Sequence, residues 1–109
     1  MSDLNQTFAA LADPGRRAIL ERLLDGEATV GDLTLTTGLS QPTVSKHVKI
    51  LREAGLIFSR VDGNRRPSAI DPEAFVGVEK WLELFGARME SNFNRLDDLL
   101  AEFLDPPDA

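Results

Sequence analysis

The chain has 109 residues, of which 42% are hydrophobic and 28% charged, a composition that predicts one folded domain. We expect a cytoplasmic protein, because no apolar run reaches the roughly 18 residues of a membrane span and no charged start leads into an apolar stretch. Cysteine is absent, which excludes disulfides and thiolate metal ligands, and there is one histidine and no tyrosine. We therefore expect no enzyme, no catalytic residue and no cofactor.

The net charge of -6 conceals an uneven distribution of charge along the chain. Residues 40–68 hold six basic and two acidic side chains, so six minus two gives +4 there and leaves -10 for the remainder. Residues 72–109 hold nine acidic side chains and three basic ones. Phosphates respond to a local basic surface rather than to the whole-protein charge, so the middle of the chain is the candidate nucleic-acid interface.

Helical spacing and capping residues predict two helices in the first 26 residues. The apolar positions of the first helix are Leu4, Phe8 and Leu11. Asp13 caps the second helix, Pro14 takes its first position and Gly26 ends it. Two basic residues of this helix, Arg16 and Arg17, fit either carboxylates within the fold or phosphates.

Two further helices separated by a glycine turn are predicted over residues 29–55. Thr29 and Asp32 form a weak capping box for the third helix, which Gly38 ends. Its predicted apolar positions are Val30, Leu33 and Leu35. Ser40 caps the fourth helix, and Gly55 ends it. The inner face of the fourth helix is predicted to carry Val44, Val48 and Leu51.

A short hairpin is predicted next, with a first strand over residues 56–61 and a return strand that ends at Ile70. Asp62, Gly63 and Asn64 supply the turn between the two strands. Because Pro67 has no N–H to donate to a ladder, we expect the return strand to lie at an edge.

The last helix is predicted to begin at Asp71 and Pro72 and to run for about 32 residues, or roughly 48 Å. This helix is longer than a domain of this size is wide, so its apolar stripe needs a cover, and a second copy of the chain is the economical one. The alternative is a helix wrapped along its own core. The predicted dimer interface comprises Leu4, Phe8, Leu11, Phe85, Met89, Phe93, Leu96, Leu99 and Phe103. We expect a single domain over residues 1–104 and a disordered tail over residues 105–109.

The order of these elements predicts a mainly α fold of about five helices with a small β-hairpin wing, a winged helix-turn-helix. In such a fold the second helix of the motif enters the DNA major groove, and the wing contacts the backbone or the minor groove. The candidate DNA-binding residues are Ser40, Gln41, Thr43, Ser45, Lys46, His47, Lys49, Arg60, Asn64, Arg65 and Arg66. For His47 two interpretations stay open, a half-buried structural residue or a phosphate contact.

The sequence resembles the ArsR-type bacterial transcriptional regulators over roughly residues 8 to 75. The matching stretches are Ala10-Leu11-Ala12-Asp13-Pro14-Gly15-Arg16-Arg17-Ala18-Ile19-Leu20, Leu39-Ser40-Gln41-Pro42-Thr43-Val44-Ser45-Lys46-His47, Leu51-Arg52-Glu53-Ala54-Gly55-Leu56-Ile57 and Asp71-Pro72. The resemblance implies a homodimeric winged-helix repressor that dimerises through its terminal helices and binds operator DNA. By this resemblance the recognition positions are Gln41, Thr43, Ser45 and Lys46, and the wing positions are Arg65 and Arg66.

The chain departs from the metal-sensing members of that family. Residues 30–34 lack the cysteine pair that some members carry, and no histidine follows His47. Soft and borderline metals need thiolate or imidazole ligands, so we expect no metal site, and any small-molecule effector is unknown. Our function prediction is a sequence-specific DNA-binding repressor that binds an inverted repeat as a homodimer. The alternative is a winged helix that binds only protein.

Overall fold

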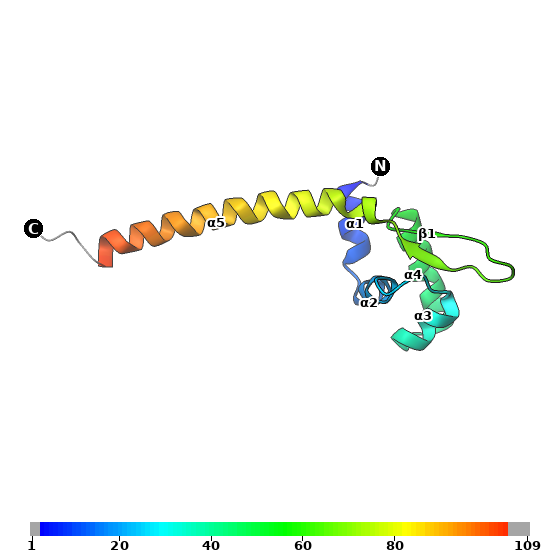
Figure 1. The fold of residues 1–109 in the computed structure, drawn as a ribbon. Helices are drawn as coiled ribbons and strands as arrows, with labels where there is room; N and C mark the ends of the chain where they lie inside the picture. Colours follow the sequence, from blue (N-terminus) through cyan, green and yellow to red (C-terminus); the bar gives the residue numbers. More distant parts are fainter. Residues whose placement is uncertain (1–2, 105–109) are drawn as a thin grey trace, which may run out of the picture. The chain divides into compact units, whose positions relative to one another are not determined.

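The computed structural model describes residues 3–104. The chain forms two compact units, of which the first ends at Gly77 and the second begins at Val78. The elements follow one another in the predicted order (Figure 1). They are α1 (Leu4–Leu11), α2 (Pro14–Leu23), α3 (Val30–Thr37), α4 (Gln41–Glu53), β1 (Ile57–Ser59), β2 (Ser68–Ile70), the 3-10 helix η1 (Pro72–Phe75) and α5 (Val76–Leu104). The predicted helices and hairpin are confirmed within residues 3–104, whereas the predicted tail, residues 105–109, lies outside the described residues.

The helices of the first unit begin at the predicted capping residues. The Asp13 carboxylate accepts from the backbone N–H groups of Gly15 and Arg16 at 2.7 and 3.2 Å. The capping box of α3 is complete, because Asp32 N–H donates to Thr29 Oγ1 at 3.2 Å and Thr29 N–H donates to Asp32 Oδ2 at 3.0 Å. Such caps satisfy backbone donors that a helix N-terminus leaves without partners.

The core of the first unit lies between α2, α3, α4 and the start of the hairpin. Its fully buried side chains include Ile19, Leu33, Val44, Leu51 and Leu56. Leu35, which we predicted to be an apolar position of α3, is instead 86% exposed. That prediction was wrong because Leu35 follows the buried Leu33 by two residues, about 200° around a helix.

The hairpin is shorter than predicted. Strands β1 and β2 pair antiparallel over three residues each, with Phe58 opposite Ala69. Beyond this ladder, Arg60 N–H still donates to the carbonyl of Pro67 at 3.0 Å. Pro67 cannot return that bond, so the ladder weakens where the first strand was expected to continue. On the other edge of β2, Ala28 and Ser68 exchange two backbone hydrogen bonds, a bridge that the sequence pattern did not predict.

The last helix begins one turn later than predicted, because residues 72–75 form the 3-10 turn η1. Asp71 caps this turn and accepts from Glu73 N–H at 3.1 Å. Helix α5 then runs for 29 residues, about 44 Å at 1.5 Å per residue. Among residues 3–104, no helix is long and apolar enough to cross a membrane.

Candidate nucleic-acid interface

Helix α4 presents two faces of opposite character. Val44, Val48 and Leu51 are buried against the core. On the other face, the predicted recognition residues Gln41, Ser45 and Lys46 are exposed and Thr43 is half-buried, and the candidate DNA contact Lys49 is exposed as well. Because α4 follows α3 after the Gly38 turn, where the glycine φ is 72°, the pair has the arrangement of a helix-turn-helix.

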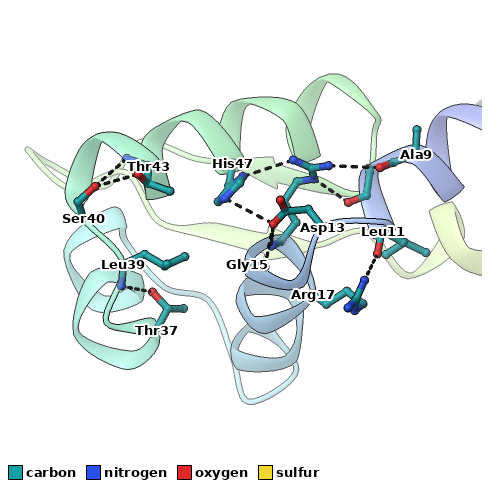
Figure 2. Close-up of polar contacts among 12 residues, drawn as sticks. Ala9, Leu11, Asp13, Gly15, Arg17, Thr37, Leu39, Ser40, Thr43 and His47 are labelled. Carbon is teal, nitrogen blue, oxygen red and sulfur yellow. Dashed lines mark hydrogen bonds and ion pairs between the residues drawn. The ribbon is translucent and has the colours of Figure 1, made fainter.

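The N-terminus of α4 is organised by two hydroxyl side chains. Ser40 Oγ accepts from Thr43 N–H at 3.4 Å and donates to Thr43 Oγ1 at 2.9 Å (Figure 2). This contact fixes the Thr43 hydroxyl on the first turn of the helix. Both hydroxyls lie at a helix N-terminus, where backbone N–H groups and the helix dipole favour a phosphate.

The cations of α4 are available for an external partner. Lys46 and Lys49 are exposed, and within residues 3–104 neither ammonium group forms an ion pair or a side-chain hydrogen bond. An unpaired surface lysine can contact a phosphate or a guanine without first giving up an internal carboxylate. Helix α4 therefore supplies positive charge and hydrogen-bond donors on the same face.

The stem of the wing is held by Arg60 and Glu27. The Arg60 guanidinium donates to both carboxylate oxygens of Glu27, with an Nε–Oε2 distance of 3.0 Å. This hydrogen bond lowers the pKa of Glu27 and raises that of Arg60. Asp62 lies 3.9 Å from the same guanidinium. Arg60, a predicted DNA contact, is therefore already engaged by carboxylates of its own chain.

The tip of the wing carries two arginines, and within the described residues Arg65 has an ion-pair partner whereas Arg66 has none. The Arg65 guanidinium lies 3.7 Å from the carboxylate of Asp32, which forms the capping box of α3 with Thr29. The pKa of Asp32 is lowered, first by the hydrogen bond with the Thr29 backbone and further by the nearby Arg65. Arg66 and Asn64 are exposed, and within the described part of the chain Arg66 has no ion-pair partner.

His47 points inward from α4, unlike its neighbours on the recognition face. Its side chain is only 12% exposed. The Arg16 Nη1 group lies 3.4 Å from Nδ1 of this ring, and Asp13 Oδ1 lies 3.6 Å from Nε2. Burial of this kind matches the structural interpretation of His47 more closely than the phosphate interpretation.

Arg16 and Arg17 direct their guanidinium groups to backbone carbonyls of α1. Arg16 donates to the carbonyls of Ala10 at 2.7 Å and Ala9 at 3.3 Å. Arg17 donates to the carbonyl of Leu11 at 2.8 Å. Both residues thus donate to carbonyls of the last turn of α1, where intrahelical donors run out.

The partners of these cations were missed by sequence reasoning. Glu27 lies 33 positions from Arg60, and His47 lies 31 positions from Arg16. Charges so far apart in a single sequence carry no spacing signal. Within residues 3–104, no group of three or more histidine, cysteine or acidic side chains is placed to hold a metal ion.

The predicted dimer residues lie on α1 and α5. On α1, Thr7 and Ala10 face the core, Leu4 is half-buried, Leu11 packs partly against the core and Phe8 is exposed. On α5, the predicted interface residues are all exposed in the single chain, and they are Phe85, Met89, Phe93, Leu96, Leu99 and Phe103. Spacings of three and four place them in one stripe along the helix.

The chain is similar in sequence and in fold to known bacterial transcriptional regulators. The family described as "Bacterial regulatory protein, arsR family" matches residues 13–59. The HTH-type transcriptional regulator Rv2034 of Mycobacterium tuberculosis is 37% identical over 94 residues, which cover 86% of this chain and 88% of the relative. The crystal structure of the ArsR family transcriptional regulator RHA00566 has 40% identity and a TM-score of 0.71, and the match covers 84% of this chain and 98% of that one.

A third relative is the homodimeric winged helix-turn-helix DNA-binding domain Mb0332 of Mycobacterium bovis, a possible ArsR-family regulator solved by NMR. It has 26% identity and a TM-score of 0.61, and the match covers 84% of this chain and 82% of that one. The predicted winged helix-turn-helix fold is confirmed by these structures. The chain belongs to the ArsR family of bacterial transcriptional regulators.

Proposed function

We propose that the chain is a transcriptional repressor that binds an inverted-repeat operator as a homodimer. The observation that carries this proposal is the outer face of α4, which combines exposed donors with Lys46 and Lys49, two lysines that have no ion-pair partner among residues 3–104. A bound dimer represses by occupying DNA that other proteins need. A winged helix that binds only protein would not need exposed lysines and donors on this face. We further propose that the protein is cytoplasmic and has no catalytic activity.

We assign base reading to the first turns of α4 and backbone contact to the remaining cations. Helix N-terminal side chains reach base edges in this class of motif, and the candidate readers are Gln41, Thr43, Ser45 and Lys46. Ser40 and Lys49 suit phosphates, as do Asn64, Arg65 and Arg66 on the wing. Arg60 orients the wing through Glu27 and reaches phosphate only if that contact is exchanged.

The dimer is proposed to form through the apolar stripe of α5 and the exposed side of α1, which Phe8 marks. Among residues 3–104, sixteen large hydrophobic side chains are exposed in the single chain, and eleven of these lie on α5. Two copies related by a twofold axis would present two α4 helices to half-sites about one helical turn apart. The homodimeric state of the Mb0332 domain supports this arrangement.

A pair of lysine variants tests the proposed function. Lys46→Ala should cost about 1–3 kcal/mol on the preferred duplex and relax sequence preference, because it removes a base contact. Lys49→Ala is the matched control, and it should weaken binding to preferred and scrambled duplexes alike, with about one unit less salt dependence. Fluorescence anisotropy at several salt concentrations measures both. If the unmodified chain binds neither duplex, the proposed function is wrong; if Lys49→Ala alone abolishes discrimination, the assigned roles are reversed.

A further inference from the structure

A cluster of polar contacts joins three helices of the first unit behind the recognition face. Arg16 on α2 bonds the last carbonyls of α1 through Nε and Nη2, and its Nη1 contacts the His47 ring on α4. The Asp13 carboxylate approaches the opposite side of the same ring (Figure 2). A single arginine therefore connects the end of α1 to the inner side of α4.

The chemistry of this contact fixes the orientation of the His47 ring. A guanidinium has only donors, so in this contact Arg16 Nη1 is the donor and His47 Nδ1 is the acceptor. Nε2 faces Asp13 Oδ1, the oxygen that also accepts from the backbone of Gly15 and Arg16. The ring therefore lies between two groups that α2 anchors, the Arg16 guanidinium and the Asp13 carboxylate.

The packing around the ring leaves little freedom for it to move. A Cβ atom added at Gly15 would lie 3.0 Å from His47 Nε2, 3.0 Å from Asp13 Oδ1 and 3.2 Å from Leu39 Cδ1. Contacts this short require the neighbours to shift. Leu39 directly precedes Ser40, the cap of α4, so the same small space touches the start of the recognition helix.

We propose that Arg16 and His47 are positioning residues that fix the rotation of α4 about its axis and couple α4 to α1. Gln6 on α1 also donates to the carbonyl of Glu53 at 3.4 Å, but this exposed contact lies at the last residue of α4. Nearer the start of α4 the buried contacts are those of Val44, Val48 and Leu51, and aliphatic packing is non-directional whereas a hydrogen bond is directional. A rotation of about 10° would move a side-chain atom that lies roughly 5 Å from the helix axis by about 1 Å. Such a shift is enough to misalign a base contact, so the pair should control sequence discrimination. This inference rests on the proposed function.

The experiment compares variants that break the link with one that does not. His47→Leu removes both ring contacts, and His47→Asn keeps an acceptor close to the position of Nδ1. Arg17→Ala is the matched control. Within the described residues, the one side-chain hydrogen bond of Arg17 is the bond to the Leu11 carbonyl at the end of α1, so this variant leaves the contacts of α4 intact. For each full-length variant, thermal unfolding checks the fold, and anisotropy measures affinity for the preferred and scrambled duplexes at several salt concentrations.

We expect His47→Leu to lower the ratio of preferred to scrambled affinity about tenfold, with the salt dependence unchanged. His47→Asn should restore much of this ratio, and Arg17→Ala should keep it. Arg16→Ala should show the same loss as His47→Leu, and the double variant should lose no more, since the two residues act as one unit.

Several results would overturn the proposal. Equal weakening on both duplexes with a flatter salt dependence would make His47 a direct phosphate contact. Unchanged discrimination in folded His47→Leu, or additive losses for Arg16 and His47, would remove the positioning role. If His47→Leu does not fold, Gly15→Ala takes its place, because it keeps every polar atom and crowds the ring together with Asp13 and Leu39. Unchanged discrimination in that variant also refutes the inference. A wild-type chain without discrimination would instead refute the proposed function.

Discussion

Replacing Leu96 with alanine tests the proposed dimer at the middle of its interface. Leu96 is 50% exposed in the single chain and lies about 20° around α5 from Phe85, near the centre of the apolar stripe. Leucine to alanine removes three carbon atoms, worth about 0.8 kcal/mol each when fully buried. Because half of the side chain is still exposed before association, the loss is about 1.2 kcal/mol per copy and about 2.4 kcal/mol per symmetric dimer. The dimer should therefore weaken roughly 50-fold.

Sedimentation equilibrium over a range of concentrations measures this change directly. Leu84→Ala is the matched control, because Leu84 is more exposed, at 65%, but lies about 100° around the helix from Phe85. The control should leave the dimer constant nearly unchanged. If Leu84→Ala weakens association as much as Leu96→Ala, or if neither does, then the stripe does not form the interface.

Three further predictions concern ionisation, the wing and metals. Hydrogen bonds from the Arg16 backbone chiefly lower the pKa of Asp13 below 3.8, so its stabilising effect is complete above that pH and is lost as the pH falls through the folded pKa. Asp13→Asn keeps a capping oxygen that does not titrate, so the free energy of unfolding measured with denaturant should fall less between pH 5 and pH 2 than in the unmodified chain. An equal fall in both proteins would contradict this. Glu27→Gln releases Arg60 toward phosphate and should raise affinity for every duplex, with a steeper salt dependence; weaker binding would show that wing orientation matters more. Micromolar zinc, copper, nickel or arsenite should leave anisotropy-measured DNA binding unchanged, and a large shift would reveal a metal site formed by other ligands.

Local chemistry made much of the fold predictable. Asp13, Ser40 and the Thr29–Asp32 box mark helix starts because a cap acts on backbone groups within three residues of itself. The buried face of α4 was predictable for a similar reason, since Val44 and Val48 are one helical turn apart. The error at Leu35 arose because a short helix offers too few turns for hydropathy alone to define its inner face.

Contacts between distant segments were not predictable from the sequence. The contact of Arg60 with Glu27, and that of Arg65 with Asp32, depend on how the wing folds back toward α3. Arg16 was assigned to carboxylates or phosphates, yet backbone carbonyls of α1 take its donors. Side-chain charge indicates what a residue can bind, but the fold decides which partner comes within reach.

Selection of duplexes from a random DNA pool by the purified chain tests the central claim most directly. Repeated binding and amplification should enrich an inverted repeat whose half-site centres lie about one helical turn apart, as two α4 helices of a symmetric dimer require. The Lys46→Ala variant should enrich the same spacing with a relaxed base preference. A retained pool with no enriched sequence, or an enriched single site without symmetry, would contradict a dimeric repressor that reads DNA through α4.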